Sequence, residues 1–140
     1  MQFDAELHRC ALIIDRELPA GLAMNAASVT GVSFGRALEN LVGSALQSQD
    51  GVTFPGLITA PLPVLMAAGD RLAELHRRCA DDESLFVLPF SALAQSCRSY
   101  GEYEARLRDT ASSTLALVAL GLAGPKKTIS RLTGDLKLYS

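Results

Sequence analysis

The chain contains 140 residues with a mass of 14.9 kDa, of which 49% are apolar and 20% charged. This size suits one packed core and is too small for two, so residues 1–140 are expected to form a single domain, and a mean hydropathy of +0.21 excludes a disordered chain. The net charge of −2 excludes a protein that is basic over its whole surface, although a local basic patch is compatible with it.

The first elements are a strand and a long helix. The aliphatic run Cys10–Ile14 ends at Asp15 and predicts the first strand. Apolar residues then recur at intervals of three and four from Gly21 to about Leu46, which predicts an amphipathic helix. Four small residues at intervals of four predict a ridge that lets this helix lie close to a sheet. They are Ala23, Ala27, Gly31 and Gly35.

A turn signal and two prolines organise the next segment. Asp50-Gly51 is a strong two-residue hairpin signal and predicts a small surface ribbon over Leu46–Phe54. Leu62–Ala67 is a second predicted strand. Because Pro61 and Pro63 lack backbone donors, this strand lies at an edge or pairs only in its later half.

The middle of the chain predicts a helix followed by a third strand. Asp70 is the expected cap of the helix, and Leu72, Leu75 and Cys79 give it a buried stripe. Ser84–Leu88 follows an acidic loop and is the third predicted strand.

Two helices are expected next. Ser91 is placed to cap a short helix over Ala92–Cys97. A further helix over Tyr100–Arg108 carries favourable pairs in which an acid precedes a base by four residues.

The last quarter predicts a central strand and a final helix. Leu115–Leu120 is apolar at every position, which is typical of a strand covered on both faces. Pro125 and Gly134 stand where a helix prefers to start and stop, and Leu136–Tyr139 is a short tail or strand.

Strands that alternate with helices predict an α/β three-layer sandwich with a small mixed, mostly parallel sheet of about four strands. In such folds ligands bind outside the carboxyl ends of the strands. A functional crevice is therefore expected there.

The chain carries no sign of a membrane or metal protein. Its longest apolar stretch, Leu115–Ala123, is about half the length of a membrane helix, and no secretory signal is expected, so the predicted location is the cytoplasm. Cys10, Cys79 and Cys97 match neither a zinc nor a redox motif and are expected to be buried thiols. No cofactor is expected.

The lysines suggest an anion site. All three lie within residues 126–137, and Lys126 and Lys127 occupy the first turn of the last helix, where the helix dipole disfavours a cation by about 0.3–1 kcal/mol. Such an exception to a local rule often marks function, because free N–H groups and two ammonium groups attract phosphate or carboxylate. The alternative is that both side chains bend into solvent.

Four further residues are candidates for the same crevice: Asp15, Asn25, Ser91 and Gln95. Each has a structural alternative. Asp15 is also suited to bond the backbone of the following turn, Asn25 to solvent or capping contacts, and Ser91 to a helix cap. Whether Asp15 and Lys126 share one crevice depends on the order of the strands. The two histidines, His8 and His76, lie too far from predicted strand ends for a Ser/His/Asp relay.

The carboxyl-terminal pattern resembles a known family. Leu117-Val-Ala-Leu-Gly121, Gly124-Pro-Lys-Lys-Thr-Ile129 and Leu132-Thr-Gly-Asp-Leu-Lys-Leu-Tyr139 together are similar to the end of type II peptidyl-tRNA hydrolases. The segment Leu18-Pro-Ala-Gly-Leu-Ala-Met-Asn25 combined with Gly124-Pro-Lys126 looks closer to an uncharacterised bacterial family of this fold, a domain of unknown function. The resemblance implies the hydrolase fold and a homodimer.

The resemblance departs at the catalytic residue. Type II hydrolases place a lysine just after the glycine that opens the long helix, and this chain has Leu22 there. The leading hypothesis is therefore an uncharacterised protein that binds a small anionic ligand, or a phosphate-bearing partner such as RNA, at the last helix. The rival hypothesis is a divergent hydrolase in which Lys126 or Asp15 replaces the missing lysine, so enzymatic activity remains open. A third alternative is a protein-interacting dimer module, which predicts an exposed apolar patch and no ligand-sized polar pocket at the strand ends.

Overall fold

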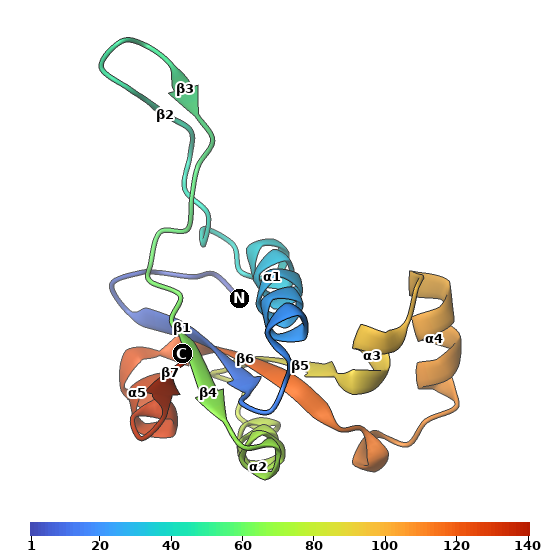
Figure 1. Ribbon diagram of the computed structural model, residues 1–140. Coiled ribbons are helices and arrows are strands. Elements are labelled where there is room, and N and C mark those ends of the chain that lie inside the picture. Colours follow the sequence, from blue (N-terminus) through green and yellow to red (C-terminus); the bar gives the residue numbers. More distant parts are fainter.

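The computed structural model describes all residues from Met1 to Ser140 and contains a five-stranded sheet between helices (Figure 1). In the order β5-β6-β1-β4-β7, the strands are β5 (Phe86–Ser91), β6 (Leu117–Pro125), β1 (His8–Asp15), β4 (Val64–Ala67) and β7 (Lys137–Leu138). The helices are α1 (Ala20–Ala37), α2 (Gly69–Cys79), α3 (Ala92–Ser96), α4 (Tyr100–Arg108) and α5 (Lys126–Thr133), with a short 3₁₀ turn at Ser112–Thr114. None of the helices is long and apolar enough to span a membrane.

The direction of the strands corrects the prediction. The α/β class is confirmed, but the sheet has five strands, and only β1 and β4 pair in parallel; the other three pairs are antiparallel. In particular, β6 runs antiparallel to β1, with His8 opposite Pro125. The continuous apolar sequence of β6 reflects burial on both faces, which does not depend on strand direction.

The three layers are confirmed. Side chains of β1 alternate between the two faces, so that Leu12 packs with Phe34 of α1 and Ile13 packs with Leu72 of α2 and Ile129 of α5. The core therefore consists of two apolar layers, one on each side of the sheet.

Helix α1 ends at Ala37, earlier than the predicted end near Leu46. Leu38 and Leu41 are buried in the core from the turn that follows, in which the Leu41 N–H donates to the Leu38 carbonyl oxygen, so their spacing only imitates a longer helix. Only the first half of the predicted ridge of small residues packs against the core, through Ala23 and Ala27, because the buried face of α1 continues along Ala26, Thr30 and Phe34. A Cβ at Gly31 would meet nothing within 4 Å.

Most other local predictions are confirmed with shifted ends. Strand β4 begins at Val64 after the two prolines, and Ser91 caps α3, whereas α2 has Ala68 rather than Asp70 at its N-cap. Helix α5 lies between Pro125 and Gly134 as expected. Cys10 and Cys79 are buried, and Cys97 is half-buried.

The predicted ribbon is confirmed as strands β2 (Leu46–Gln47) and β3 (Thr53–Phe54), at the end of an arm formed by residues 42–58. The arm projects away from the sheet and helices (Figure 1). Gly51 forms its tip with a φ of 84°, which glycine adopts without strain. At its base, a Cβ on Gly56 would collide with the carbonyl oxygen of Gly43, so the two chains of the arm approach closely there.

Candidate functional site

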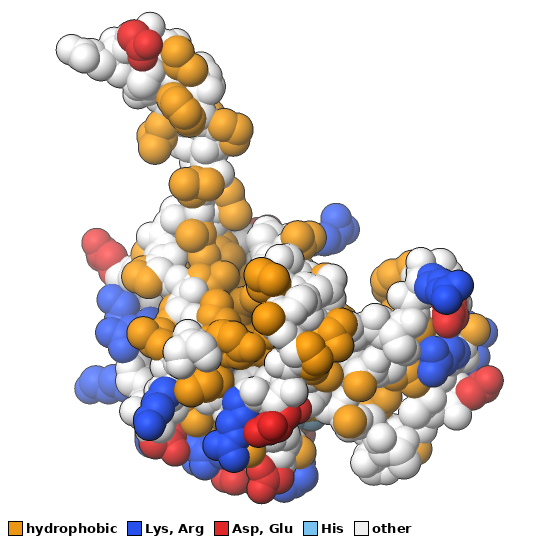
Figure 2. All heavy atoms as spheres, viewed as in Figure 1, with side chains coloured by type: hydrophobic (Ala, Val, Ile, Leu, Met, Phe, Trp, Pro, Cys, Tyr) orange, Lys and Arg blue, Asp and Glu red, His pale blue; other side chains and the backbone are white.

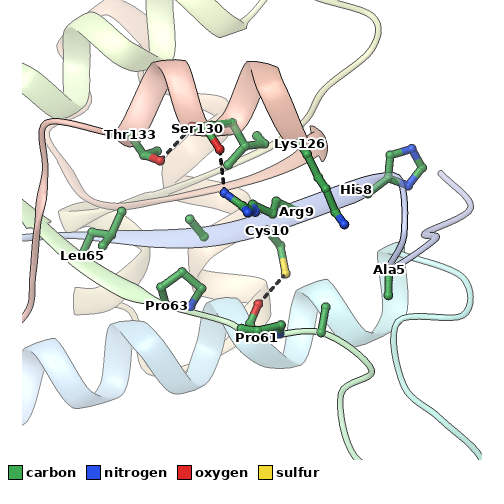
Figure 3. Close-up of a pocket in the computed structure, with 14 residues that line it drawn as sticks. Ala5, His8, Arg9, Cys10, Pro61, Pro63, Leu65, Lys126, Ser130 and Thr133 are labelled. Carbon is green, nitrogen blue, oxygen red and sulfur yellow. Dashed lines mark hydrogen bonds between the residues drawn. The ribbon is translucent and has the colours of Figure 1, made fainter.

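The principal cavity lies along the first half of β1. Strand β4 pairs with β1 only from Leu12 onward, because Pro61 and Pro63 precede it and supply no backbone donors. The first half of β1 is therefore open on this side, and a cavity of about 560 Å³ lies between it, the flank of α5 and the segment 60–63 (Figure 3). This volume lies within the range of small-molecule sites.

Two cationic side chains line this cavity, Arg9 from β1 and Lys126 from α5, and none of its 14 lining residues is Asp or Glu. The Nη1 of Arg9 donates to the Ser130 hydroxyl at 2.6 Å, and this hydrogen bond holds the guanidinium beside α5 (Figure 3). The cavity therefore combines two positive charges with no acidic counter-charge in its wall.

The site is the flank of α5 rather than its tip. The backbone N–H of Lys126 donates to the carbonyl oxygen of Leu7 at 3.1 Å, so the first amide of the helix is already satisfied. Lys126, Ile129, Ser130 and Thr133 lie on one face of α5 and line the cavity together. The neighbouring Lys127 is exposed and is not part of the cavity wall.

The thiol of Cys10 lies at the floor of the cavity. It donates to the carbonyl oxygen of Pro61 at 3.6 Å, and burial raises its pKa to about 11. Because the thiolate is the reactive form of cysteine, this neutral thiol is unsuited to nucleophilic catalysis at pH 7.

His8 stands at the mouth of the cavity. Its Nδ1 accepts a hydrogen bond from the backbone N–H of Asp4 at 3.0 Å. A neutral imidazole that accepts at Nδ1 carries its proton on Nε2, so His8 retains one donor for a ligand.

Asp15 and Lys126 do not share a crevice. Because β6 runs antiparallel to β1, α5 begins beside His8, whereas Asp15 is at the other end of β1, about 23 Å away for an extended strand. The Asp15 carboxylate instead accepts the backbone N–H of Glu17 at 2.9 Å, which is the structural alternative for this residue.

Two of the other predicted residues do meet. The Gln95 amide donates to the Asn25 side-chain oxygen at 3.1 Å and to the Leu22 carbonyl oxygen at 2.9 Å. These bonds connect α3 to the first turns of α1. Ligand binding by Asn25 and Gln95 stays a prediction.

Ser91 acts as the helix cap that the sequence indicated. It is buried, and its hydroxyl accepts the backbone N–H of Ala94 at 3.1 Å. Replacing Ser91 by Ala is expected to lower the free energy of unfolding by about 1 kcal/mol, because the first turn of α3 loses this acceptor. Urea denaturation measures the loss, and Ser91→Thr, which keeps a neutral hydroxyl acceptor in this buried position, serves as the comparison.

Arg9 was missed by sequence reasoning. It directly precedes the aliphatic run of β1, and a lone arginine at the start of a strand is normally a solvated residue. The signal that could have found it is the alternation of β1, which puts Arg9 on the same face as Ala11 and Ile13, toward α5. The structure contains no group of three or more His, Cys, Asp or Glu residues that could hold a metal ion.

Comparison with known proteins places the chain in a family. A solved structure of a protein of unknown function from Agrobacterium tumefaciens strain C58 shares the fold, with a TM-score of 0.80 at 15% sequence identity over 95% of this chain and 98% of that chain. No curated protein matches the sequence. The family model "Protein of unknown function (DUF2000)" matches residues 8–140. The chain therefore belongs to the DUF2000 family of proteins of unknown function.

Proposed function

We propose that the chain binds a small anionic ligand, with a phosphate or carboxylate group held by Arg9 and Lys126 in the cavity between β1 and α5. The observation that carries this proposal is the wall of the cavity, which has two cations and no carboxylate. Side-chain cations without acidic partners attract an anion, and hydrogen bonds to charged groups contribute about 1.5–3 kcal/mol each.

The remainder of the wall favours a ligand with an apolar part. Pro61, Pro63, Leu65 and Ile129 are the larger apolar residues of the wall. At the polar side, the Ser130 hydroxyl accepts from Arg9 and keeps its own proton for a ligand oxygen. A phosphorylated or carboxylated metabolite with a small apolar body matches this combination of a polar and an apolar part in the cavity wall.

The hydrolase alternative has weaker support. Leu22, which replaces the lysine expected from the resemblance, lies in the first turn of α1, and α1 follows the Asp15 end of β1. It is therefore at the opposite end of β1 from the cavity cations. RNA, the other partner considered, requires a wider basic surface than two side chains supply.

Calorimetric titration with inorganic phosphate, a nucleoside monophosphate, a dicarboxylate and a short RNA tests the proposal. The variant Arg9→Ala with Lys126→Ala is expected to weaken binding of the best of these probes by about 10-fold or more, because two charge-assisted contacts are lost. Lys127→Ala with Arg131→Ala is the matched control, since it also removes two positive charges, from exposed positions on α5 outside the cavity wall, and it should leave the affinity unchanged.

Two results would contradict the proposal. One is an affinity that the double variant leaves unchanged. The other is an equal loss in the control variant Lys127→Ala with Arg131→Ala, which would indicate a nonspecific effect of net charge. Circular dichroism establishes that both variants keep the fold, which is expected because Arg9 is exposed and Lys126 is only half-buried.

A further inference from the structure

The arm formed by residues 42–58 has no core of its own. None of its residues is buried, and its two strands contain two residues each. Yet it carries large apolar side chains that are far from covered, among them Leu46 (70% exposed), Phe54 (55%) and Leu57 (80%). A two-stranded hairpin is at best marginally stable in water, so an arm with this composition lacks a partner for its apolar side chains.

The outer face of α1 is a second apolar surface. Met24 is 66% exposed and Val32 is 77% exposed, and two glycines on this helix, Gly21 and Gly31, have open space where a Cβ would be. Glycine disfavours a helix by about 1 kcal/mol relative to alanine, and neither position has an intramolecular contact that requires it. Small residues on an exposed helix face permit close approach of another chain.

The two surfaces are continuous and almost uncharged. Val42, at the base of the arm, lies beside Gly35 of α1. The chain has 13 basic and 15 acidic residues, but residues 18–69 contain only Arg36, Glu39 and Asp50. Figure 2 shows apolar side chains along the arm and over the body near α1, with charged side chains gathered elsewhere in the view. Depletion of charge is characteristic of the centre of a protein interface.

We propose that two copies of this chain form a dimer in which the arm of each copy lies on the α1 face of the other. With roughly 150–200 Å² for each fully exposed side chain of this size, the exposed apolar residues leave about 600 Å² on the arm, and Met24 and Val32 leave about 250 Å² on the outer face of α1. Their total of about 850 Å² per copy matches the roughly 800 Å² per partner of a standard interface. A dimer with two-fold symmetry buries both arms and both α1 faces at once, because each copy supplies one arm and one helix face.

The scarcity of basic residues in the arm and α1 disfavours a lipid surface or a nucleic acid as the partner of these two apolar surfaces. Surfaces that bind lipid headgroups or nucleic acid carry several Lys or Arg residues, and residues 18–69 contain one basic residue. The base of the arm is also held in place, by hydrogen bonds from Gly43 N–H to Leu57 O at 2.8 Å and from Thr59 N–H to Leu41 O at 2.7 Å. A fixed projecting arm suits one defined partner surface.

Sedimentation velocity of the full chain is expected to give a particle of twice 14.9 kDa. The variant Leu46→Asp with Phe54→Asp should weaken the dimer at least about 100-fold, because two charges would be buried without partners. Leu46 is paired with Phe54 across the ribbon, and Gln47 is paired with Thr53 on its other face. Gln47→Asp with Thr53→Asp is therefore the matched control, and its dimer should remain. All four residues are exposed, so the melting temperature of the isolated monomer should be the same in both variants.

A disulfide experiment identifies the docking surface. Chains with Phe54→Cys and chains with Val32→Cys, both also carrying Cys97→Ser, are mixed and oxidised. The proposal expects a cross-linked dimer in the mixture and little in either variant alone. Cross-linking within Phe54→Cys alone would mean that the arms meet each other, and it would overturn docking on α1.

Three outcomes overturn the dimer itself. They are a mass of 14.9 kDa at every concentration up to about 100 µM, a dimer that dissociates equally in the control variant, and a monomer that cosediments with phosphatidylcholine vesicles. The last would identify a lipid surface as the occupant of the arm.

Discussion

Replacing Phe34 by Ala is expected to lower the free energy of unfolding by about 3–5 kcal/mol, the usual cost of removing a buried phenyl ring. Phe34 is fully buried on the face of α1 that packs on the sheet, and its ring centroid lies 5.7 Å from that of Phe86. Gly121 of β6 provides the space for this ring, since a Cβ there would lie 2.7 Å from Phe34 Cζ. Urea denaturation followed by circular dichroism measures the loss.

The same contact predicts that Phe34 and Gly121 act as a pair. Gly121→Ala alone should cost about 1–3 kcal/mol, because the buried ring has no free space to move into. In the Phe34→Ala background the added methyl group occupies the vacated space, so its cost should nearly disappear and the two changes should not be additive. Gly101→Ala, where a Cβ meets nothing within 4 Å, is the control and should leave stability unchanged or slightly higher. Additive losses of stability would show that the Phe34 ring does not limit the size of the side chain at position 121.

Local structure was predictable where a residue type has one strong physical preference. Asp50-Gly51 predicted the hairpin, and Pro125 with Gly134 predicted the limits of α5. Ser91 predicted a capped helix. In each case the backbone conformation or the hydrogen bond involves residues within a few positions of one another, so one sequence contains all the information required.

The direction of β6 was not predictable in this way. Its sequence is apolar at every position because helices cover both faces of the sheet, and this pattern is the same for parallel and antiparallel strands. The wrong direction of β6 put the expected ligand site at the wrong end of β1. With β6 parallel to β1, Lys126 would follow the Asp15 end of β1, whereas the observed antiparallel pairing puts Lys126 beside His8.

Apolar periodicity also failed at the end of α1. Leu38 and Leu41 continue the helical spacing, but they reach the core from a turn after the helix, in which Asn40 has a φ of 68° that a right-handed helix does not contain. Val29 fits the same spacing but is 39% exposed. Its exposure is a tertiary property, since it depends on which face of α1 the sheet covers.

Alkaline pH is expected to remove about 3 kcal/mol of stability through Cys10. Burial raises the pKa of this thiol from 9.0 to about 11 in the folded protein, so between these values the unfolded chain loses a proton that the folded chain keeps. The contribution is fully present below pH 9 and is lost as the pH rises to 11. Urea denaturation at intervals from pH 7 to pH 11 measures it.

Other groups also titrate in this range, so the comparison of variants isolates the thiol. Cys10→Ala should be less stable than the natural chain at pH 7, because its buried sulfur is lost, but its further loss between pH 9 and 11 should be about 3 kcal/mol smaller. Cys97→Ala keeps Cys10 and should follow the natural chain. If all three proteins lose the same stability between pH 9 and 11, the Cys10 thiol ionises as easily in the folded chain as in the unfolded one. The cavity floor would then be wet, and the burial that raises the pKa of this thiol would be wrong.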